Sequence, residues 1–151
     1  MKKLTYCIYV WASLICVHAQ TSLDLSYYFP QNITYNPEVP SPRAFLGFEV
    51  GEWHVSHDRL MFYMYKLAET SDRVSIEAHG KTYEGRPILM LTITSPENHK
   101  NITEIQAEHL KLSDPNESSK LDIAQMPVVL WMGYSIHGNE ASGSNAALAV
   151  A

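Results

Sequence analysis

The fold is decided by the stretch Met126-Pro-Val-Val-Leu-Trp-Met-Gly-Tyr-Ser-Ile-His-Gly-Asn-Glu-Ala-Ser-Gly-Ser-Asn145. It opens with a short apolar run, residues 128–132, whose length and composition predict a buried strand. His137 and Glu140 follow the run, and the small residues of 142–151 predict the start of a closely packed helix. An imidazole and a carboxylate at the end of a strand can converge on one cation, and zinc accepts both ligand types.

The His-x-x-Glu spacing by itself does not assign a metal site. The chain has seven His, and Glu is so common that one such pair is expected by chance at about even odds. The alternative is a surface His close to a helix N-terminus, where the helix dipole favours Glu140. The surroundings of the pair must therefore decide between the two.

Composition restricts the class of protein. The chain has 151 residues, 46% of them hydrophobic and 18% charged, which is enough for one domain with a core. Its net charge is -5 and its Lys and Arg residues are not clustered, so nucleic acid is not an expected partner. No apolar run reaches the roughly 18 residues of a membrane span. Oligomeric state is left open.

The first 19 residues have the pattern of a secretory signal peptide. Lys2 and Lys3 precede an apolar region at 4–17, and Val17-His18-Ala19 resembles a cleavage site before Gln20. An uncleaved N-terminal anchor is the alternative. The pattern predicts a secreted or periplasmic protein. Both cysteines lie inside this segment, so the mature chain would have neither a disulfide nor a Cys ligand.

Residues 20–44 are rich in Pro, Tyr and Asn, which predicts an extended N-terminal arm. Residues 45–53 continue it with apolar anchors. Within 54–70 the apolar residues recur every three or four positions, which predicts a helix with Ser56 as N-cap. His54 and His57 share a His-x-x-His spacing, but no strong third ligand lies nearby, so both are interpreted as surface or capping residues.

The remaining segments predict strands, a turn and helices. Apolar and polar residues alternate over 73–79, as they do in a half-buried strand. The glycines and proline of 80–87 predict a turn. The apolar residues of 88–94 predict a strand buried on both faces. A helix is expected at 98–112 and a loop at 113–125. The expected fold is α/β, a mixed β-sheet flanked by helices, in which 73–79 pairs antiparallel with 88–94 and 128–132 joins the same sheet.

Two signatures together give a resemblance to a family. The turn Gly80-Lys-Thr-Tyr-Glu-Gly-Arg-Pro87, followed about fifty residues later by strand-Gly-x-x-x-His-Gly-Asn-Glu140, resembles the zinc carboxypeptidases of the carboxypeptidase A type. The resemblance covers roughly residues 45–151. It implies that His137 and Glu140 are zinc ligands, that the cofactor is Zn2+, and that the fold is carboxypeptidase-like.

The resemblance also implies a function and its missing parts. It implies hydrolysis of the peptide bond at the C-terminus of a peptide or protein, in which zinc polarises the carbonyl and activates water while a Glu takes the proton. The family's second zinc His, its carboxylate-binding Arg and its general base would lie beyond Ala151. Residues 45–151 are therefore expected to be the N-terminal part of the domain, inactive alone, with no catalytic residue besides the ligands.

Two alternatives to a carboxypeptidase remain open. A related zinc amidohydrolase that deacylates small amino-acid derivatives would use the same first two ligands. A carboxypeptidase-like binding module would keep the fold without catalysis, although an intact His137 and Glu140 pair argues against it. Asn139 stands where some digestive members of the family carry a substrate-contacting Arg, so that contact is not expected here.

Overall fold

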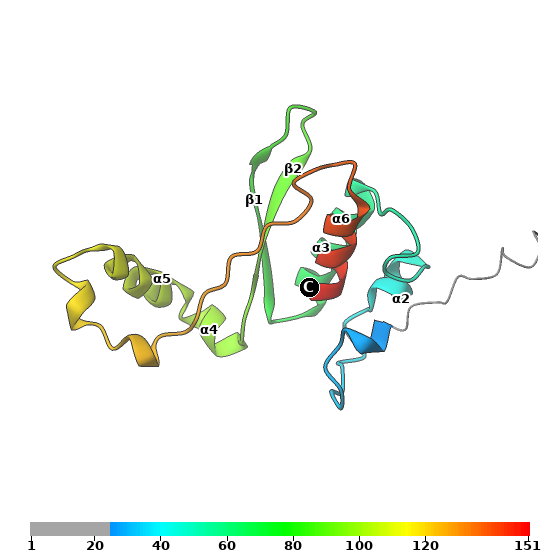
Figure 1. Cartoon of the computed structure of the whole chain (residues 1–151). Coiled ribbons are helices and arrows are strands. Elements are labelled where there is room, and N and C mark those ends of the chain that lie inside the picture. The colour runs from blue at the N-terminus through cyan, green and yellow to red at the C-terminus, as the bar shows by residue number, and fades with distance from the viewer. Residues whose placement is uncertain (1–24) are drawn as a thin grey trace, which may run out of the picture. The chain divides into compact units, whose positions relative to one another are not determined.

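The computed structural model describes residues 25–151, and the predicted signal peptide therefore lies outside the described residues. The chain divides after Thr34 into two compact units, the second being Tyr35–Ala151. In the first, a short 3-10 turn spans Leu25–Tyr27, and Tyr27 at its end forms an edge-to-face pair with Tyr28, with ring centroids 5.1 Å apart. The second (Figure 1) contains helices and strands at α2 Pro42–Leu46, α3 His57–Thr70, β1 Val74–Lys81, β2 Pro87–Ile93, α4 Pro96–Lys100, α5 Ile102–Leu110 and α6 Ala141–Val150, with 3-10 turns at Lys111–Ser113, Ser118–Lys120 and Ile123–Gln125.

Helix α3 carries the largest part of the core, as its apolar periodicity predicts. Tyr63 and Leu67 are each 3% exposed, and Met64 is buried beside them. Ser56 is the N-cap residue, as predicted. Its side chain hydrogen-bonds to the Asp58 carboxylate, which holds the pKa of Asp58 below its ordinary value.

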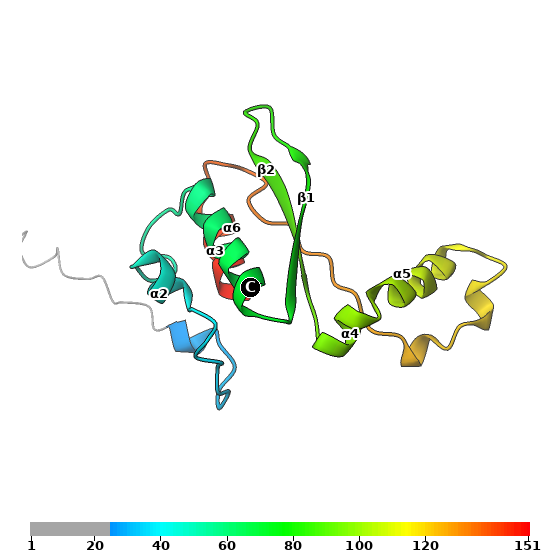
Figure 2. The same ribbon diagram turned by 180° about the vertical axis from the view of Figure 1, so that it is seen from behind.

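Helix α6 packs on α3, and the two helices lie side by side in Figure 1 and in the reverse view of Figure 2. The prediction of a closely packed helix of small residues is confirmed, since Ala147 and Leu148 are buried against the α3 side chains. Small side chains let two helix backbones approach closely. Leu46 and Val55, both from the segment that leads into α3, complete the buried core.

Strands β1 and β2 form the predicted antiparallel hairpin. Val74 pairs with Ile93 and Ile76 with Leu91, and the register is irregular between Ala78 and Lys81. The tight turn is closed by the Gly85 N–H, which donates to the Thr82 carbonyl at 2.9 Å. Gly85 has a φ of 76°, a conformation that glycine adopts without steric cost.

The prediction that the second strand is buried on both faces is wrong. Ile88 is 52% exposed and Ile93 48% exposed, although both belong to β2. Leu91 does pack against the core, together with Val74 and Ile76 of β1. Among the described residues, only part of the hairpin therefore packs on the core. The apolar composition of β2 did not ensure that both of its faces are buried.

The predicted third strand at 128–132 is also wrong. These residues have no strand conformation, and their side chains are between 56% and 87% exposed. Within residues 25–151, none of their backbone groups hydrogen-bonds to another segment. A strand is stabilised by its neighbour, and no described segment takes that place. The described sheet thus has two antiparallel strands instead of the mixed sheet that was expected.

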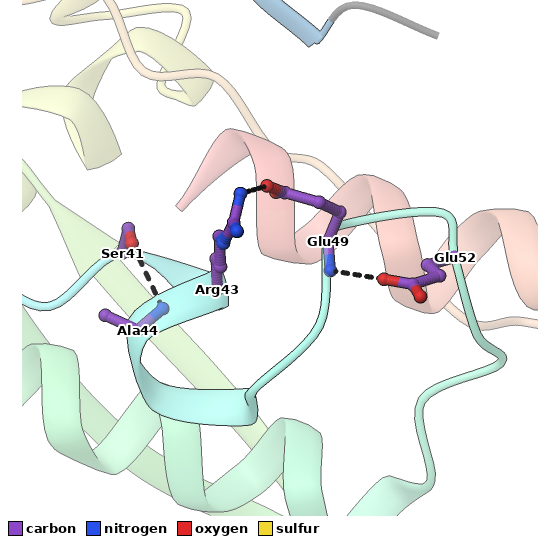
Figure 3. A network of polar contacts seen from close by, with 5 residues as sticks. All are labelled: Ser41, Arg43, Ala44, Glu49 and Glu52. Atoms are coloured by element: carbon purple, nitrogen blue, oxygen red, sulfur yellow. Dashed lines mark hydrogen bonds and ion pairs between the residues drawn. The ribbon is translucent and has the colours of Figure 1, made fainter. Parts of the chain in front are cut away.

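The predicted extended arm is wrong for its last residues, because Pro42–Leu46 is helical. Ser41 accepts a hydrogen bond from the Ala44 N–H at 3.2 Å, and Arg43 pairs with Glu49, whose own N–H bonds to Glu52 (Figure 3). Proline is compatible with the first turn of a helix, where its missing N–H has no helical partner to lose. The apolar anchors predicted at 45–53 are confirmed only in part, since Phe48 and Val50 pack on the core while Trp53 is exposed.

The helix predicted at 98–112 is present as two shorter helices, α4 and α5, which meet at Asn101. Neither helix has a buried residue. One contact fixes the segment that follows: the His109 Nε2 atom lies 2.9 Å from the Pro127 carbonyl oxygen. In the part of the chain that the structure describes, no helix is long and apolar enough to cross a membrane.

Burial of Tyr63 predicts a specific loss of stability in alkali. Burial raises the pKa of its hydroxyl from 10.0 to about 12, so the folded state disfavours the phenolate. Because the pKa is raised on folding, this stability is fully present below pH 10 and is lost as pH rises toward 12. Urea unfolding at several pH values should show that the free energy of unfolding declines across this window. The decline should be smaller in Tyr63→Phe. The exposed neighbour Tyr65→Phe is the control, and equal pH slopes for both variants and the parent would contradict the account.

Candidate metal-binding site

His137 and Glu140 lie at the two ends of one reverse turn. The Glu140 N–H donates to the His137 carbonyl at 3.1 Å, with Gly138 and Asn139 between them. Such a hydrogen bond closes a β-turn, whose first and last Cα atoms lie within about 7 Å of each other. The structure therefore brings the two predicted ligands onto one compact turn, which follows the stretch predicted as a strand.

Both side chains are exposed and have no competing partner in the described chain. Within residues 25–151, neither the His137 imidazole nor the Glu140 carboxylate forms a hydrogen bond or ion pair with another side chain or backbone group. Glu140 is the N-cap residue of α6, but its side chain makes no capping hydrogen bond. Glu140 thus lies at a helix N-terminus, as the alternative interpretation predicts. Its carboxylate oxygens are nevertheless free to bind a ligand.

Two donors do not complete a zinc site, and the described residues supply no third. No group of three or more His, Cys, Asp or Glu side chains that could hold a metal occurs among residues 25–151. His54 is exposed, and His57 is the first residue of α3. Neither joins His137 and Glu140 in such a group within the described residues.

The turn is supported by Asn145, a residue to which the sequence assigned no role. Its side chain is only 9% exposed. The Oδ1 atom accepts from the Gly51 N–H at 2.9 Å, while Nδ2 donates to the Trp53 carbonyl at 3.1 Å and to the Ala141 carbonyl at 3.0 Å. A buried amide with three hydrogen bonds fixes the first turn of α6 to the segment before α3. The only signal in the sequence was a polar residue within a run of small ones.

Two further contacts connect α6 to the residues before His137. A Cβ atom on Gly143 would lie 2.7 Å from the Ser135 nitrogen, so only glycine fits at this position without a shift. The next residue, Ser144, donates its hydroxyl to the Ser135 Oγ at 3.3 Å. The turn with the two candidate ligands is therefore attached to α6 on both sides, through Ser135 and through Glu140.

Comparison with known proteins identifies a family. A family model described as zinc carboxypeptidase matches residues 60–151, which is more than half of the chain and includes both His137 and Glu140. No curated protein and no solved structure matches.

Replacing Asn145 by Leu should destabilise the chain by about 2–4 kcal/mol, because the Gly51 N–H and the Trp53 carbonyl would lose their buried partner. Urea unfolding followed by circular dichroism measures this difference. Ser142→Ala, an exposed change on the same helix, should stay within about 0.5 kcal/mol of the parent. If the two variants were equally stable, the three hydrogen bonds would not hold α6 in place.

Proposed function

The chain belongs to the zinc carboxypeptidase family, and we propose that His137 and Glu140 are two ligands of a zinc ion in a metallocarboxypeptidase. The observation that carries this proposal is the turn itself, which presents an exposed imidazole and an exposed carboxylate, both free of other partners, three residues apart. These donor types are the ones that catalytic zinc sites combine. Members of the family are generally hydrolases, and the substrate proposed here is the C-terminus of a peptide or protein.

The two side chains have donor atoms that zinc accepts, and both are accessible to the ion. A neutral imidazole offers one nitrogen lone pair, and a carboxylate supplies a negative oxygen that offsets part of the ion's charge. Neither group would have to give up a hydrogen bond or ion pair within the described chain to bind the ion. When bound, zinc polarises a carbonyl group and lowers the pKa of a coordinated water.

In this proposal the roles of the two residues are limited to binding. His137 and Glu140 hold the ion and keep one position open, and neither transfers a proton. No third ligand joins these two among the described residues, so the proposed complete site takes its remaining protein ligand from residues other than 25–151. The resemblance to the family places the general base and the binding group for the substrate carboxylate outside these residues as well. The 151-residue chain alone is then proposed to hold zinc weakly and to be inactive.

A zinc titration with matched His variants tests the assignment. In the 151-residue chain, His137→Ala or Glu140→Ala should abolish the weak zinc binding, because each removes half of the available donors. His54→Ala, which removes an exposed His outside the turn, should leave the zinc affinity unchanged. The measurement is isothermal titration calorimetry, with NMR of the His imidazole signals to identify which side chains bind.

The same variants in a protein that carries the whole domain should lose zinc and peptidase activity together. Assays on a peptide with a free C-terminus and on a small N-acylated amino acid separate a carboxypeptidase from a deacylase. Tight stoichiometric zinc in the 151-residue chain, or loss of zinc in His54→Ala or His57→Ala, would move the site away from the turn. Retention of zinc without hydrolysis of either substrate would favour a binding module.

A further inference from the structure

Ser135 has a backbone conformation that its residue type does not favour. Its φ is 58°, in the left-handed region, and it lies two residues before His137. Among the described non-glycine residues, Asn32 alone shares a positive φ, and Asn tolerates this region better than most residues do. Ser lacks that tolerance, so the contacts around Ser135 have to maintain its conformation.

Helix α6 supplies those contacts. The absence of a side chain at Gly143 allows the Ser135 backbone to approach the helix, since a Cβ atom there would lie 2.7 Å from the Ser135 nitrogen and 3.1 Å from its Cα. The buried Ser144, 5% exposed, adds a hydrogen bond from its hydroxyl to that of Ser135. Two consecutive residues of α6 thus contact Ser135, and Asn145 holds the same turn of the helix to Gly51 and Trp53.

The consequence is a short loop with two fixed ends. Ser135 is held on α6 through Gly143 and Ser144, while Glu140 is the N-cap residue of the same helix. His137 lies between these ends. A rotation of Ser135 out of the left-handed region would redirect the chain that follows it, whereas Glu140 would remain attached to the helix. The separation between the imidazole and the carboxylate therefore depends on the Ser135 conformation.

We propose that Ser135 is a positioning residue, whose left-handed conformation, held by Gly143 and Ser144, sets the geometry of the turn from His137 to Glu140. Its importance for zinc rests on the proposed function, but its effect on the turn does not. Ser135 touches neither the metal nor the substrate in this proposal. It acts through the two side chains that do, because metal ligands bind well only when their supporting contacts fix their direction.

Two substitutions of Ser135 separate conformation from hydrogen bonding. Ser135→Gly and Ser135→Val both remove the hydroxyl, but glycine adopts the left-handed region freely whereas a β-branched residue strongly avoids it. Ser144→Ala removes the hydroxyl bond and leaves Ser135 intact. Ser142→Ala is the matched control, an exposed serine on the same helix. Ser135→Ala, which shares the conformational penalty with less bulk, replaces Ser135→Val if that variant does not fold.

The primary measurement is hydrogen exchange of the Glu140 amide, which donates to the His137 carbonyl, in the folded 151-residue chain without metal. Ser135→Val should raise its exchange rate about tenfold, as expected from the cost of a left-handed conformation. Ser135→Gly should stay within about twofold of the parent, Ser144→Ala should fall between them, and Ser142→Ala should have no effect. Zinc affinity of the same samples, followed by the His137 imidazole signal, should fall in the same order.

The outcomes distinguish this inference from the function on which it rests. Equal exchange in the Gly and Val variants would overturn the positioning role, as would a lower melting temperature in Ser135→Val with unchanged Glu140 exchange in the folded state. If exchange follows the expected order but zinc leaves the His137 signal unchanged in the parent, the positioning role stands and the proposed zinc function fails.

Discussion

The Asn145 amide is the interaction on which the arrangement of the described chain depends most. It lies in α6 and joins three backbone groups, two of them in the segment before α3, more than ninety residues earlier in the chain. Apolar packing of Ala147 and Leu148 holds α6 against α3 but does not specify how far the helix is shifted along its axis. Directional hydrogen bonds do specify it. Since Glu140 is the N-cap residue of this helix, the hydrogen bonds of Asn145 also set the position of the candidate ligands.

Local elements of the fold could be predicted because their determinants are local. The apolar stripe of α3 includes Tyr63 and Leu67. The turn around Gly85 is closed by a hydrogen bond between residues three apart, so the sequence of the turn is enough to predict a hairpin there. The strand expected at 128–132 failed for the opposite reason. Its apolar residues require a neighbouring strand to be buried, and composition does not reveal whether one is present. The short helix after Ser41 was missed because proline was interpreted as a helix breaker where it opens a first turn.

The candidate site also has a part that the sequence suggests and a part that it does not. His137 and Glu140 could be proposed as ligands from their spacing together with the resemblance to a family, and the structure places the two residues on one turn. Their support could not be identified. The roles of Asn145 and Ser135 depend on contacts with Gly51 and Gly143 that no periodicity encodes. The positive φ of Ser135 could not be predicted from the sequence, because it depends on contacts with the backbone of α6.

The central claim, that the turn beginning at His137 forms half of a zinc site, is tested most directly by diffraction at the zinc absorption edge. Crystals of the 151-residue chain soaked in zinc would be used, with unsoaked crystals as the reference. The account predicts an anomalous peak about 2.0–2.2 Å from an imidazole nitrogen of His137 and from a carboxylate oxygen of Glu140. A peak on His54 or His57, with none at the turn, would contradict it.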